Sequence, residues 1–387
     1  MKLFILTSRF PYPIEKGDKL RLYYQIKVLA NYHQIILCAL SEYDVPQKDI
    51  EALQPFCDKI YTFKRNKFQI GKNLLLAGIK GNPFQIGYFY DKSIHRQITT
   101  VIETEKPDHI YVQLIRVAPY LKDIDIPKTI DFMDTFSIGA VRWANKASFW
   151  LKPILNREAR LLAKYEATVF EQFEHHTIIS SQDRAFLRFD KKDRIHIIPN
   201  GVDTSFFTPL PNVVQKYDIA FVGNMGYRPN VEAARYLVEE VLPLLIKQYP
   251  NIKILIAGAR PTPLVKRLAS KQITVSGWID DIRMAYAEAK MIAAPLFIGM
   301  GQQNKILEAM AMGTPCITTT MVNNAIGAKP NYEILLADNP NEFVQQINKI
   351  LTQPMLQENI RAAGLKFVRD NFSWNFFVDE LNKLFIE

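Results

Sequence analysis

The sequence predicts two consecutive doubly wound α/β domains, each with a parallel sheet between helices. Short apolar segments typical of buried strands alternate with amphipathic helical segments along most of the chain. The alternation lapses once, at residues 206–215, in a segment with two prolines, and then resumes. In addition, 387 residues are more than one hydrophobic core usually serves. The predicted organisation is a first domain at 1–205, a linker at 206–215, a second domain at 216–370 and a C-terminal helical segment at 371–387.

The first domain opens with a strand, a loop, a helix and a second strand, the order expected for a parallel sheet with crossover helices. Its predicted strands are residues 2–8, 33–41, 109–115, 128–134, 176–180 and 195–199. Its predicted helices are residues 20–32, 93–105 and 156–173.

The second domain repeats this alternation. Its predicted strands are residues 217–222, 252–258, 273–278, 290–297 and 315–320. Its predicted helices are residues 230–250, 263–270, 281–289, 304–313, 340–352 and 357–371, with a last helix at 373–385. Ligands of such sheets bind beyond the carboxyl ends of the strands, so we expect the site there, in the space between the two domains.

The composition predicts a globular, cytoplasmic protein. Hydrophobic residues make up 48% of the chain and aromatic residues 12%, which excludes a disordered chain. No apolar run reaches the roughly 18–20 residues that span a bilayer, and the N-terminal segment is typical of a first strand and not of a signal peptide. The three cysteines, Cys38, Cys57 and Cys316, form neither a disulfide framework nor a metal pattern.

The positive charge is unevenly distributed. The net charge is +9, with 30 Lys and Arg against 22 Asp and Glu in residues 1–200, and 18 against 17 in the remainder. The first half therefore could face anionic lipid, nucleic acid or a phosphorylated substrate, or the excess could serve ordinary solubility. No motif that combines aromatic and basic residues for nucleic-acid binding is present, so we expect no nucleic-acid partner.

A strand-to-helix junction in the second domain, Pro295–Thr320, predicts an anion site. Gly299 and Gly301 would let the backbone approach a ligand closely. The N–H groups of residues 302–304 (Gln302, Gln303, Asn304) would open a helix N-terminus suited to a diphosphate, and Lys305 adds a positive charge. Glu308, one turn later, could accept hydrogen bonds from a ribose. Glycine-rich turns are also common in α/β folds, in which case Glu308 would be an ordinary helix-surface residue.

Polar residues also follow strands of the first domain. The loop "RFPYPIEKGDKLR" contains Gly17, which permits close backbone approach, and basic residues that include Lys19. The alternative is an ordinary crossover loop stiffened by prolines. Asp134 ends a later strand, where it could accept a hydrogen bond from an acceptor hydroxyl or cap the next helix. Gln113 and Arg116 follow another strand and are candidates for the acceptor side.

Residues 149–151, Phe-Trp-Leu, lie beside basic residues. They could form an interfacial patch that meets a lipid-linked acceptor at the cytoplasmic face of a membrane. The alternative is a helix that packs on the sheet and presents a solvated face.

Several segments in order resemble the retaining glycosyltransferase family 4, over nearly the whole chain and most closely from Ile197 to Thr320. They are "IIPNGVDTSFFTP", "FVGNMGYRPNVEAARYL", "VSGWIDDIRMAYAEAKMIAAPL" and "NKILEAMAMGTPCITT". The opening loop and "QNKILEAMAMG" resemble the bacterial exopolysaccharide, PEP-CTERM-associated sugar transferase branch. The resemblance implies a GT-B fold and a hexosyltransferase-type enzyme that takes a nucleotide-sugar donor, with no cofactor and no required metal. Its acceptor would be a saccharide or a lipid-linked saccharide.

The resemblance also implies roles for individual residues. Glu308 matches the family's second motif acid, which holds the donor ribose, whereas Met300 replaces the usual first acid, so the sugar contacts are in doubt. Asp134 matches a position where many members place a catalytic-site histidine or aspartate, and Gly17 matches a glycine beside the diphosphate and sugar. The segment around Trp374 resembles a helix that crosses back to the first domain.

Two further loops match the donor side of the family. The base-contacting loop falls at Gly277, Trp278 and Ile279, although Trp278 could instead be a core aromatic residue. A loop that touches the diphosphate falls at Gly223 and Asn224, with Arg228 as the nearby basic residue, which could equally be exposed and without a role. These matches name the donor-binding set, while Asp134, Lys305 and Glu308 form the predicted catalytic set.

The predicted reaction is transfer of a sugar to a hydroxyl with retention of anomeric configuration, by a same-face route that the family implies. The departing diphosphate would be stabilised electrostatically. Two alternatives remain, namely a nucleotide-sugar epimerase or hydrolase of the same architecture and a non-catalytic protein that binds nucleotide sugars.

Overall fold

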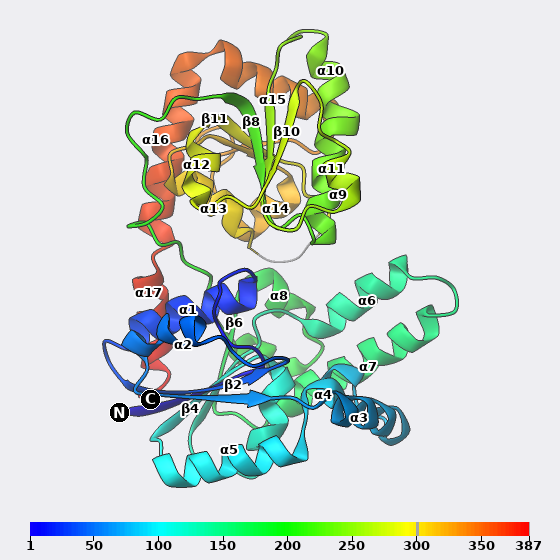
Figure 1. The fold of residues 1–387 in the computed structure, drawn as a ribbon, viewed down its shortest axis with the longest axis vertical. Helices are drawn as coiled ribbons and strands as arrows, with labels where there is room; N and C mark the ends of the chain where they lie inside the picture. The colour runs from blue at the N-terminus through cyan, green and yellow to red at the C-terminus, as the bar shows by residue number, and fades with distance from the viewer. Residues whose placement is uncertain (299–301, 387) are drawn as a thin grey trace. The chain divides into compact units, whose positions relative to one another are not determined.

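The computed structural model describes residues 1–298 and 302–386 and consists of two compact units (Figure 1). The first unit comprises Met1–Pro199 and the C-terminal helix, and the second comprises Asn200–Ser373. Residues 200–205, which the sequence pattern assigns to the first domain, lie in the second unit. The cause is local bonding, since the Val202 amide donates to the carbonyl of Phe372 (2.8 Å) and Val202 forms a bridge with Ser373.

In the described residues of the first unit, a parallel sheet of seven strands has the order β3-β2-β1-β4-β5-β6-β7. Its strands are β1 (Lys2–Thr7), β2 (Gln34–Ser41), β3 (Lys59–Lys64), β4 (His109–Gln113), β5 (Lys128–Asp131), β6 (His175–Ile178) and β7 (His196–Ile197). The inner strands β1, β2, β4 and β5 are buried almost throughout, as strands covered on both faces must be.

Helices cover both faces of this sheet. They are α1 (Gly17–Leu29), α2 (Gln47–Glu51), α3 (Lys67–Lys80), α4 (Phe84–Phe89), α5 (Lys92–Glu105), α6 (Phe136–Lys146), α7 (Lys152–Phe170), α8 (Ser181–Phe186) and α17 (Trp374–Lys383), with 3-10 turns η1 (Gln54–Phe56), η2 (Ile115–Leu121) and η3 (Asp190–Arg194). One core lies beneath α1 and α17, where Trp374 stacks on Tyr24 with ring centroids 5.2 Å apart. A second core lies on the other face, beneath α5 and α7.

A buried ion pair joins α1 to the carboxyl end of β5. Arg21 and Asp131 are both inaccessible to solvent, and Nε of Arg21 donates to Oδ2 of Asp131 at 2.6 Å. The other carboxylate oxygen accepts from Thr177 Oγ1 (3.0 Å) on β6 and from the Met133 amide (3.1 Å). Such a pair fixes geometry because each charge depends on its partner once both are desolvated.

The second unit contains, among its described residues, a parallel sheet of six strands in the order β10-β9-β8-β11-β12-β13. Its strands are β8 (Tyr217–Val222), β9 (Ile254–Ala257), β10 (Ile273–Gly277), β11 (Ala289–Ala294), β12 (Cys316–Thr318) and β13 (Leu335–Leu336). Its helices are α9 (Arg228–Tyr236), which continues through a π-turn η4 (Leu237–Val241) into α10 (Leu242–Ile246), then α11 (Pro263–Lys266), α12 (Ile282–Ala287), α13 (Asn304–Ala311), α14 (Thr320–Ile326), α15 (Pro340–Thr352) and α16 (Pro354–Asn371).

Two glycines bring the ends of β8 and β9 into close approach. A Cβ at Gly258, whose φ is +137°, would lie 1.8 Å from the carbonyl oxygen of Gly223. A Cβ at Gly223 would lie 2.7 Å from Nδ2 of Asn230 and 3.1 Å from Nζ of Lys305. No other residue fits at position 258 without moving a strand end.

The structure adds elements that the sequence pattern does not predict. Residues 59–89 hold β3, α3 and α4, and residues 136–146 form α6. Gly17, expected in a loop, is the first residue of α1. All three cysteines are free and buried, and burial raises the pKa of each thiol, to about 12 for Cys57.

Replacing Arg21 with methionine should destabilise the protein by about 3–5 kcal/mol, because the Asp131 carboxylate would remain buried without its counter-ion. Urea unfolding followed by tryptophan fluorescence and circular dichroism would measure the change. Lys27→Met, at an exposed position of the same helix, is the matched control and should cost less than about 0.5 kcal/mol. Equal losses in both variants would contradict this account of the ion pair.

Candidate active site

The strand order of the second unit determines where its ligand site lies. From β8 the chain moves outward to β9 and β10, then returns to β11 and continues in the other direction to β12 and β13. The switch point is therefore between β8 and β11, and ligands of open α/β sheets bind at the carboxyl end of that point. Helix α13 follows β11, so its first turn lies at the predicted position.

Lys305, in the first turn of α13, is held by Asn230 of α9. Its Nζ donates to Oδ1 of Asn230, whose own Nδ2 donates to the carbonyl of Asn224 at 2.9 Å. The ammonium also lies 5.2 Å from the ring centroid of Phe221. Burial lowers the pKa of Lys305 to about 8, although the nearby carboxylate of Glu308 acts in the opposite direction. A partly desolvated ammonium beside a helix N-terminus is well suited to a phosphate.

Glu308 is one turn further along α13. The hydroxyl of the buried Tyr286 donates to its Oε2 at 2.7 Å. Burial raises the pKa of Glu308, while the Tyr286 bond and Lys305 act against that change. Within the part of the chain that the structure describes, the second carboxylate oxygen, Oε1, accepts no hydrogen bond, so a ligand hydroxyl could donate to it. Tyr286 thus orients an acid that the sequence predicted as a ribose ligand.

The side-chain amides at the start of α13 and the backbone N–H groups there have different roles. Gln302 makes a paired bond to the backbone of Asn200, in which its Oε1 accepts from the amide (2.8 Å) and its Nε2 donates to the carbonyl (2.7 Å). The side chain of Asn200 also donates to Oδ1 of Asn304 at 3.4 Å. These side chains therefore fix the junction, and the backbone N–H groups in the first turn of α13 are the further candidates for ligand recognition. Gly299, Met300 and Gly301 lie outside the described residues.

The predicted base-contacting loop is shaped by Gly277, whose φ of +72° favours glycine. The carbonyl of Gly277 accepts from the amide of Gly258 at 2.9 Å. Trp278 is exposed and donates to Asp280 at 3.0 Å, so the alternative of a core aromatic residue is wrong. Ile279 is half-buried.

The loop after β8 has an internal turn and one exposed basic residue. Oδ1 of Asn224 accepts from the amide of Gly226 at 2.9 Å. Arg228 begins α9, is exposed and pairs with Glu232 of the same helix at 3.7 Å. Gly223 is required by the packing of Lys305 and Asn230 described above, which is a structural reason for this glycine in addition to any ligand contact.

In the first unit, Gly17 differs from the other predicted glycines. It is exposed at the start of α1, its φ is not in the left-handed region, and a Cβ would meet nothing within 4 Å. The fold therefore does not require glycine there, which is consistent with close approach of a ligand. Lys19, by contrast, is buried, donates to the carbonyl of Tyr12 at 3.3 Å and has its pKa lowered by burial. Its contact stabilises the preceding loop.

Gln113 and Arg116, the predicted acceptor-side residues, are engaged within the unit. The side chain of Gln113 is buried, donates to the carbonyl of Asp18 at 2.8 Å and accepts from Thr7 at 3.2 Å. Gln113 thus positions the first turn of α1. Arg116 lies between two rings, 4.9 Å from Phe89 and 4.6 Å from Phe136, and burial lowers its pKa to about 10.

Asp134 lies in a cluster of acids at the end of β5. Burial, followed by the negative charge of Asp183, raises its pKa to about 7, while Arg116 acts against this. Glu166 of α7 has its pKa raised to about 7 mainly by burial, and it accepts from the amide (2.9 Å) and hydroxyl (2.7 Å) of Ser137. The N-cap of α6 is Thr135, so Asp134 does not occupy the capping position that was its alternative role. A carboxyl that titrates near neutrality is suited to hydrogen-bond or proton chemistry.

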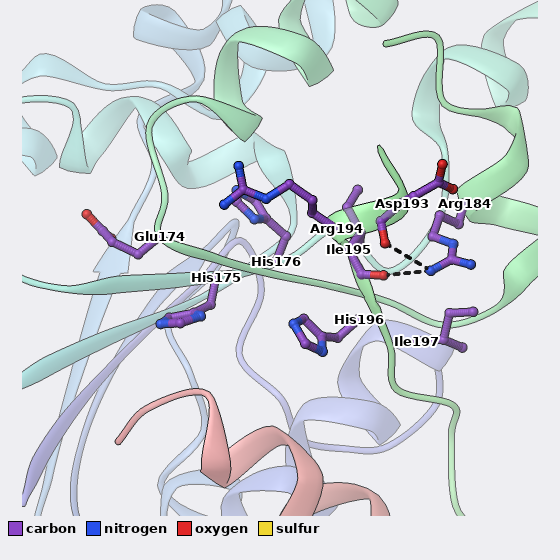
Figure 2. Close-up of a pocket in the computed structure, with 9 residues that line it drawn as sticks. All are labelled: Glu174, His175, His176, Arg184, Asp193, Arg194, Ile195, His196 and Ile197. Atoms are coloured by element: carbon purple, nitrogen blue, oxygen red, sulfur yellow. Dashed lines mark hydrogen bonds between the residues drawn. The ribbon is translucent and has the colours of Figure 1, made fainter. Parts of the chain in front are cut away.

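A cavity of about 550 Å³ in the first unit lies at the amino ends of β6 and β7 (Figure 2). Its lining includes His175 and His176 at the amino end of β6 and His196 at the amino end of β7. His176 donates from Nε2 to the Phe170 carbonyl at 2.7 Å, and burial lowers its pKa to about 4. Because ligands of doubly wound sheets bind at the carboxyl edge, this cavity is not the candidate site. Within residues 1–298 and 302–386, no group of three or more His, Cys, Asp or Glu side chains is placed to hold a metal.

Three contributors to the site had no usable sequence signal. Tyr286, Asn230 and Asn200 support Glu308, Lys305 and Gln302 across 22, 75 and 102 residues of sequence. Each is an ordinary helix or turn residue in its local context. Only the hydrogen bonds from Lys305 to Asn230 and from Tyr286 to Glu308 make the first two of them part of the site.

Comparison with known proteins finds similarity to glycosyltransferases. Residues 216–353 match the model of a family described as "Glycosyl transferases group 1". The chain is 21% identical over 393 residues to an uncharacterised 44.6 kDa protein in the cps region of Klebsiella pneumoniae, covering 96% of both chains. Sucrose-phosphate synthase of Thermosynechococcus elongatus has a similar structure (TM-score 0.73, 16% identity, coverage 100% and 98%). So does HepE of Anabaena in complex with UDP and glucose (TM-score 0.68, 14% identity, 98% of each chain).

The two Rossmann-like units have the GT-B fold, as predicted. The family match at residues 216–353 lies within the second unit, which carries Lys305 and Glu308, and it supports an enzyme of the glycosyltransferase type. No described helix is long and apolar enough to cross a membrane.

Replacing Asp134 with asparagine should raise the melting temperature more at pH 8 than at pH 5. The folded-state pKa lies above the unfolded value, so ionisation of Asp134 costs stability as the pH rises from about 4 to 7. At pH 5 the native carboxyl is protonated and resembles the amide.

Differential scanning fluorimetry would measure both melting temperatures. Asp123→Asn, an exposed position in the same unit, should show no pH-dependent gain. A lower melting temperature for Asp134→Asn at pH 8 would show that the protein stabilises the ionised carboxylate and would reverse this sign.

Proposed function

We propose that the protein transfers a sugar from a nucleotide-diphosphate sugar to a hydroxyl of a saccharide or lipid-linked saccharide, with retention of anomeric configuration. The observation that carries the proposal is the first turn of α13. There a partly desolvated ammonium, held by Asn230, and a carboxylate, oriented by Tyr286, are one helical turn apart at the switch point of the sheet. This pair matches a diphosphate and a ribose in charge and in hydrogen-bonding capacity.

The proposed reaction breaks the bond between the anomeric carbon and the diphosphate oxygen. A bond to the acceptor oxygen forms on the same face of the sugar, and the acceptor proton moves to the departing diphosphate. Lys305 and the backbone N–H groups in the first turn of α13 would stabilise the charge that develops on the leaving group. No metal or other cofactor is invoked in this proposal.

Asp134 is the proposed partner of the acceptor hydroxyl. Its ionised carboxylate would accept a hydrogen bond from that hydroxyl and so hold the hydroxyl oxygen in place. With a pKa of about 7, Asp134 would be only partly ionised at neutral pH, so turnover should rise from pH 6 to pH 8.

We also propose a role in the synthesis of a surface polysaccharide, which is supported by the similarity to a Klebsiella pneumoniae protein named for its place in the cps region. A UDP-linked donor is supported by the likeness to HepE, solved with UDP and glucose. We propose a cytoplasmic enzyme that meets its acceptor at the membrane surface.

An epimerase or hydrolase of the same fold would consume the donor without an acceptor, and a binding protein would not consume it at all. Donor turnover measured with and without saccharide acceptors separates the three functions. Acceptor-dependent release of the nucleoside diphosphate supports transfer, whereas equal turnover without an acceptor would contradict it.

Glu308→Ala should weaken binding of UDP or GDP, whichever the wild type binds, by about tenfold or more. A hydrogen bond to a charged group contributes about 1.5–3 kcal/mol, and 1.4 kcal/mol corresponds to tenfold. Isothermal titration calorimetry would give the affinity, with Glu358→Ala on exposed α16 as the control. Unchanged affinity in Glu308→Ala would remove the proposed ribose contact.

Donor affinity should also depend on pH through Lys305. The lysine is protonated below its pKa of about 8, whereas the terminal phosphate of the nucleotide loses its last proton near pH 6. Nucleoside diphosphate affinity should therefore be constant near pH 7 and weaken above pH 8. In Lys305→Arg, which stays protonated, the affinity should stay constant to pH 9.5. The same loss in both proteins would show that another group titrates.

A further inference from the structure

Helix α3 presents an apolar face to solvent. Phe68, Leu75 and Ile79 are 92%, 68% and 74% exposed, and they follow one another at helical spacing on one side of the helix. The exposed Lys72 lies on the same side, while Ala77 faces the protein. Helices of soluble proteins normally bury their apolar side, so this exposed face indicates a partner surface.

The hairpin between α6 and α7 presents a second exposed apolar set. Phe149 and Trp150, at its tip, are 78% and 81% exposed, with their rings edge to face at 5.6 Å. Other exposed apolar residues of the hairpin are Trp143, Leu151 and Ile154. Helix α7 itself packs on the sheet through residues that begin at Leu155, so the packed-helix alternative describes α7 but not the tip.

The two sets lie on neighbouring elements (Figure 1). The Arg157 guanidinium of α7 donates to the carbonyl of Gly78 in α3 at 2.9 Å and lies 5.6 Å from the Phe84 ring of α4. Gly78 lies between Leu75 and Ile79 in sequence, and Ile154 lies one turn before Arg157. We call the exposed apolar and basic residues of α3 and of the α6–α7 hairpin the α3–α7 face.

The positive charge of the α3–α7 face indicates which kind of partner binds it. Residues 67–90 contain three lysines, residues 135–157 contain four Lys or Arg, and neither segment contains Asp or Glu. The exposed ones among them are Lys67, Lys72, Lys80 and Lys152, so the face carries at least four positive charges. A second copy of the chain would oppose like charges across such an interface, which is unfavourable.

An anionic bilayer supplies apolar surroundings for the exposed Phe, Trp and Leu side chains and negative charge for the lysines. Phe, Trp and Leu side chains insert at the boundary of headgroups and acyl chains, and Lys side chains extend to the phosphates. Each lysine near an anionic surface adds attraction that is screened by salt.

We propose that the α3–α7 face docks this protein on a membrane surface rich in anionic lipid. The inference goes beyond the transfer reaction and does not require it, although docking would bring the enzyme to a lipid-linked acceptor. The sequence pattern pointed to residues 149–151, whereas the apolar side of α3 is evident only from its exposure in the structure.

Vesicle co-sedimentation tests the proposal, with vesicles of phosphatidylcholine alone or with 30% phosphatidylglycerol. The wild type should bind the anionic vesicles, bind neutral vesicles at least tenfold less, and lose most binding in 0.5 M NaCl. The double variant Phe68→Ser/Leu75→Ser should lower the partition coefficient by about tenfold or more, because two apolar side chains are no longer removed from water. Lys72→Glu should lower it roughly fivefold or more.

Two control variants test whether substitutions of the same kind outside the α3–α7 face also weaken vesicle binding. Met355→Ser changes an exposed apolar residue of α16, and Lys271→Glu changes the charge as Lys72→Glu does but in the second unit. Both should bind vesicles like the wild type, and all variants should keep the wild-type melting temperature.

Several results would overturn the proposal. They are absence of binding to anionic vesicles, equal binding to neutral vesicles, and equal losses in the control variants. Concentration-dependent dimerisation in sedimentation velocity that Phe68→Ser/Leu75→Ser abolishes would assign the face to a second copy instead. Vesicle binding without any nucleotide-induced rise in melting temperature would preserve this inference and contradict the proposed function.

Discussion

The first unit depends on the ion pair between Arg21 and Asp131. Asp131 ends β5, Arg21 belongs to the helix that follows β1, and Thr177 of β6 donates to the same carboxylate. The guanidinium also donates to the carbonyl of Pro199 at 3.3 Å, where this unit ends. One fully desolvated charge pair therefore fixes α1, two neighbouring strands and the exit of the chain. The exposed start of α1 and the acid cluster after β5 are both anchored to it.

The second unit depends on a different feature, which is the close approach of the backbone at the ends of β8 and β9. Gly258 permits contact with the carbonyl of Gly223, and Gly223 in turn leaves room for the side chains of Asn230 and Lys305. The result is a lysine that is kept partly out of water before any ligand arrives. Such preorganisation is what electrostatic stabilisation of a leaving group requires, because the groups need no rearrangement during the reaction.

Much of the architecture could be predicted from the sequence because it depends on local patterns. The continuous apolar strands, the interruption near residue 206 and the helix at 304 all have short-range signals. The junction at Lys305 and Glu308 was predictable for the same reason, since it lies between a strand and a helix. The orienting roles of Tyr286 and Asn230 were not, because they arise from contacts between helices far apart in the sequence. Helix α3 was missed because its apolar residues face water, so that its pattern is not that of a core helix.

The buried thiols make the molecule convenient for spectroscopy. Cys38, Cys57 and Cys316 are inaccessible and have raised pKa values, so they carry little of the thiolate that reacts with maleimides at neutral pH. A cysteine introduced on the surface would therefore be labelled selectively in the native protein without removing the natural ones. A fluorophore or spin label could then report from any chosen helix, and unfolding would reveal itself by the appearance of three additional reactive sites.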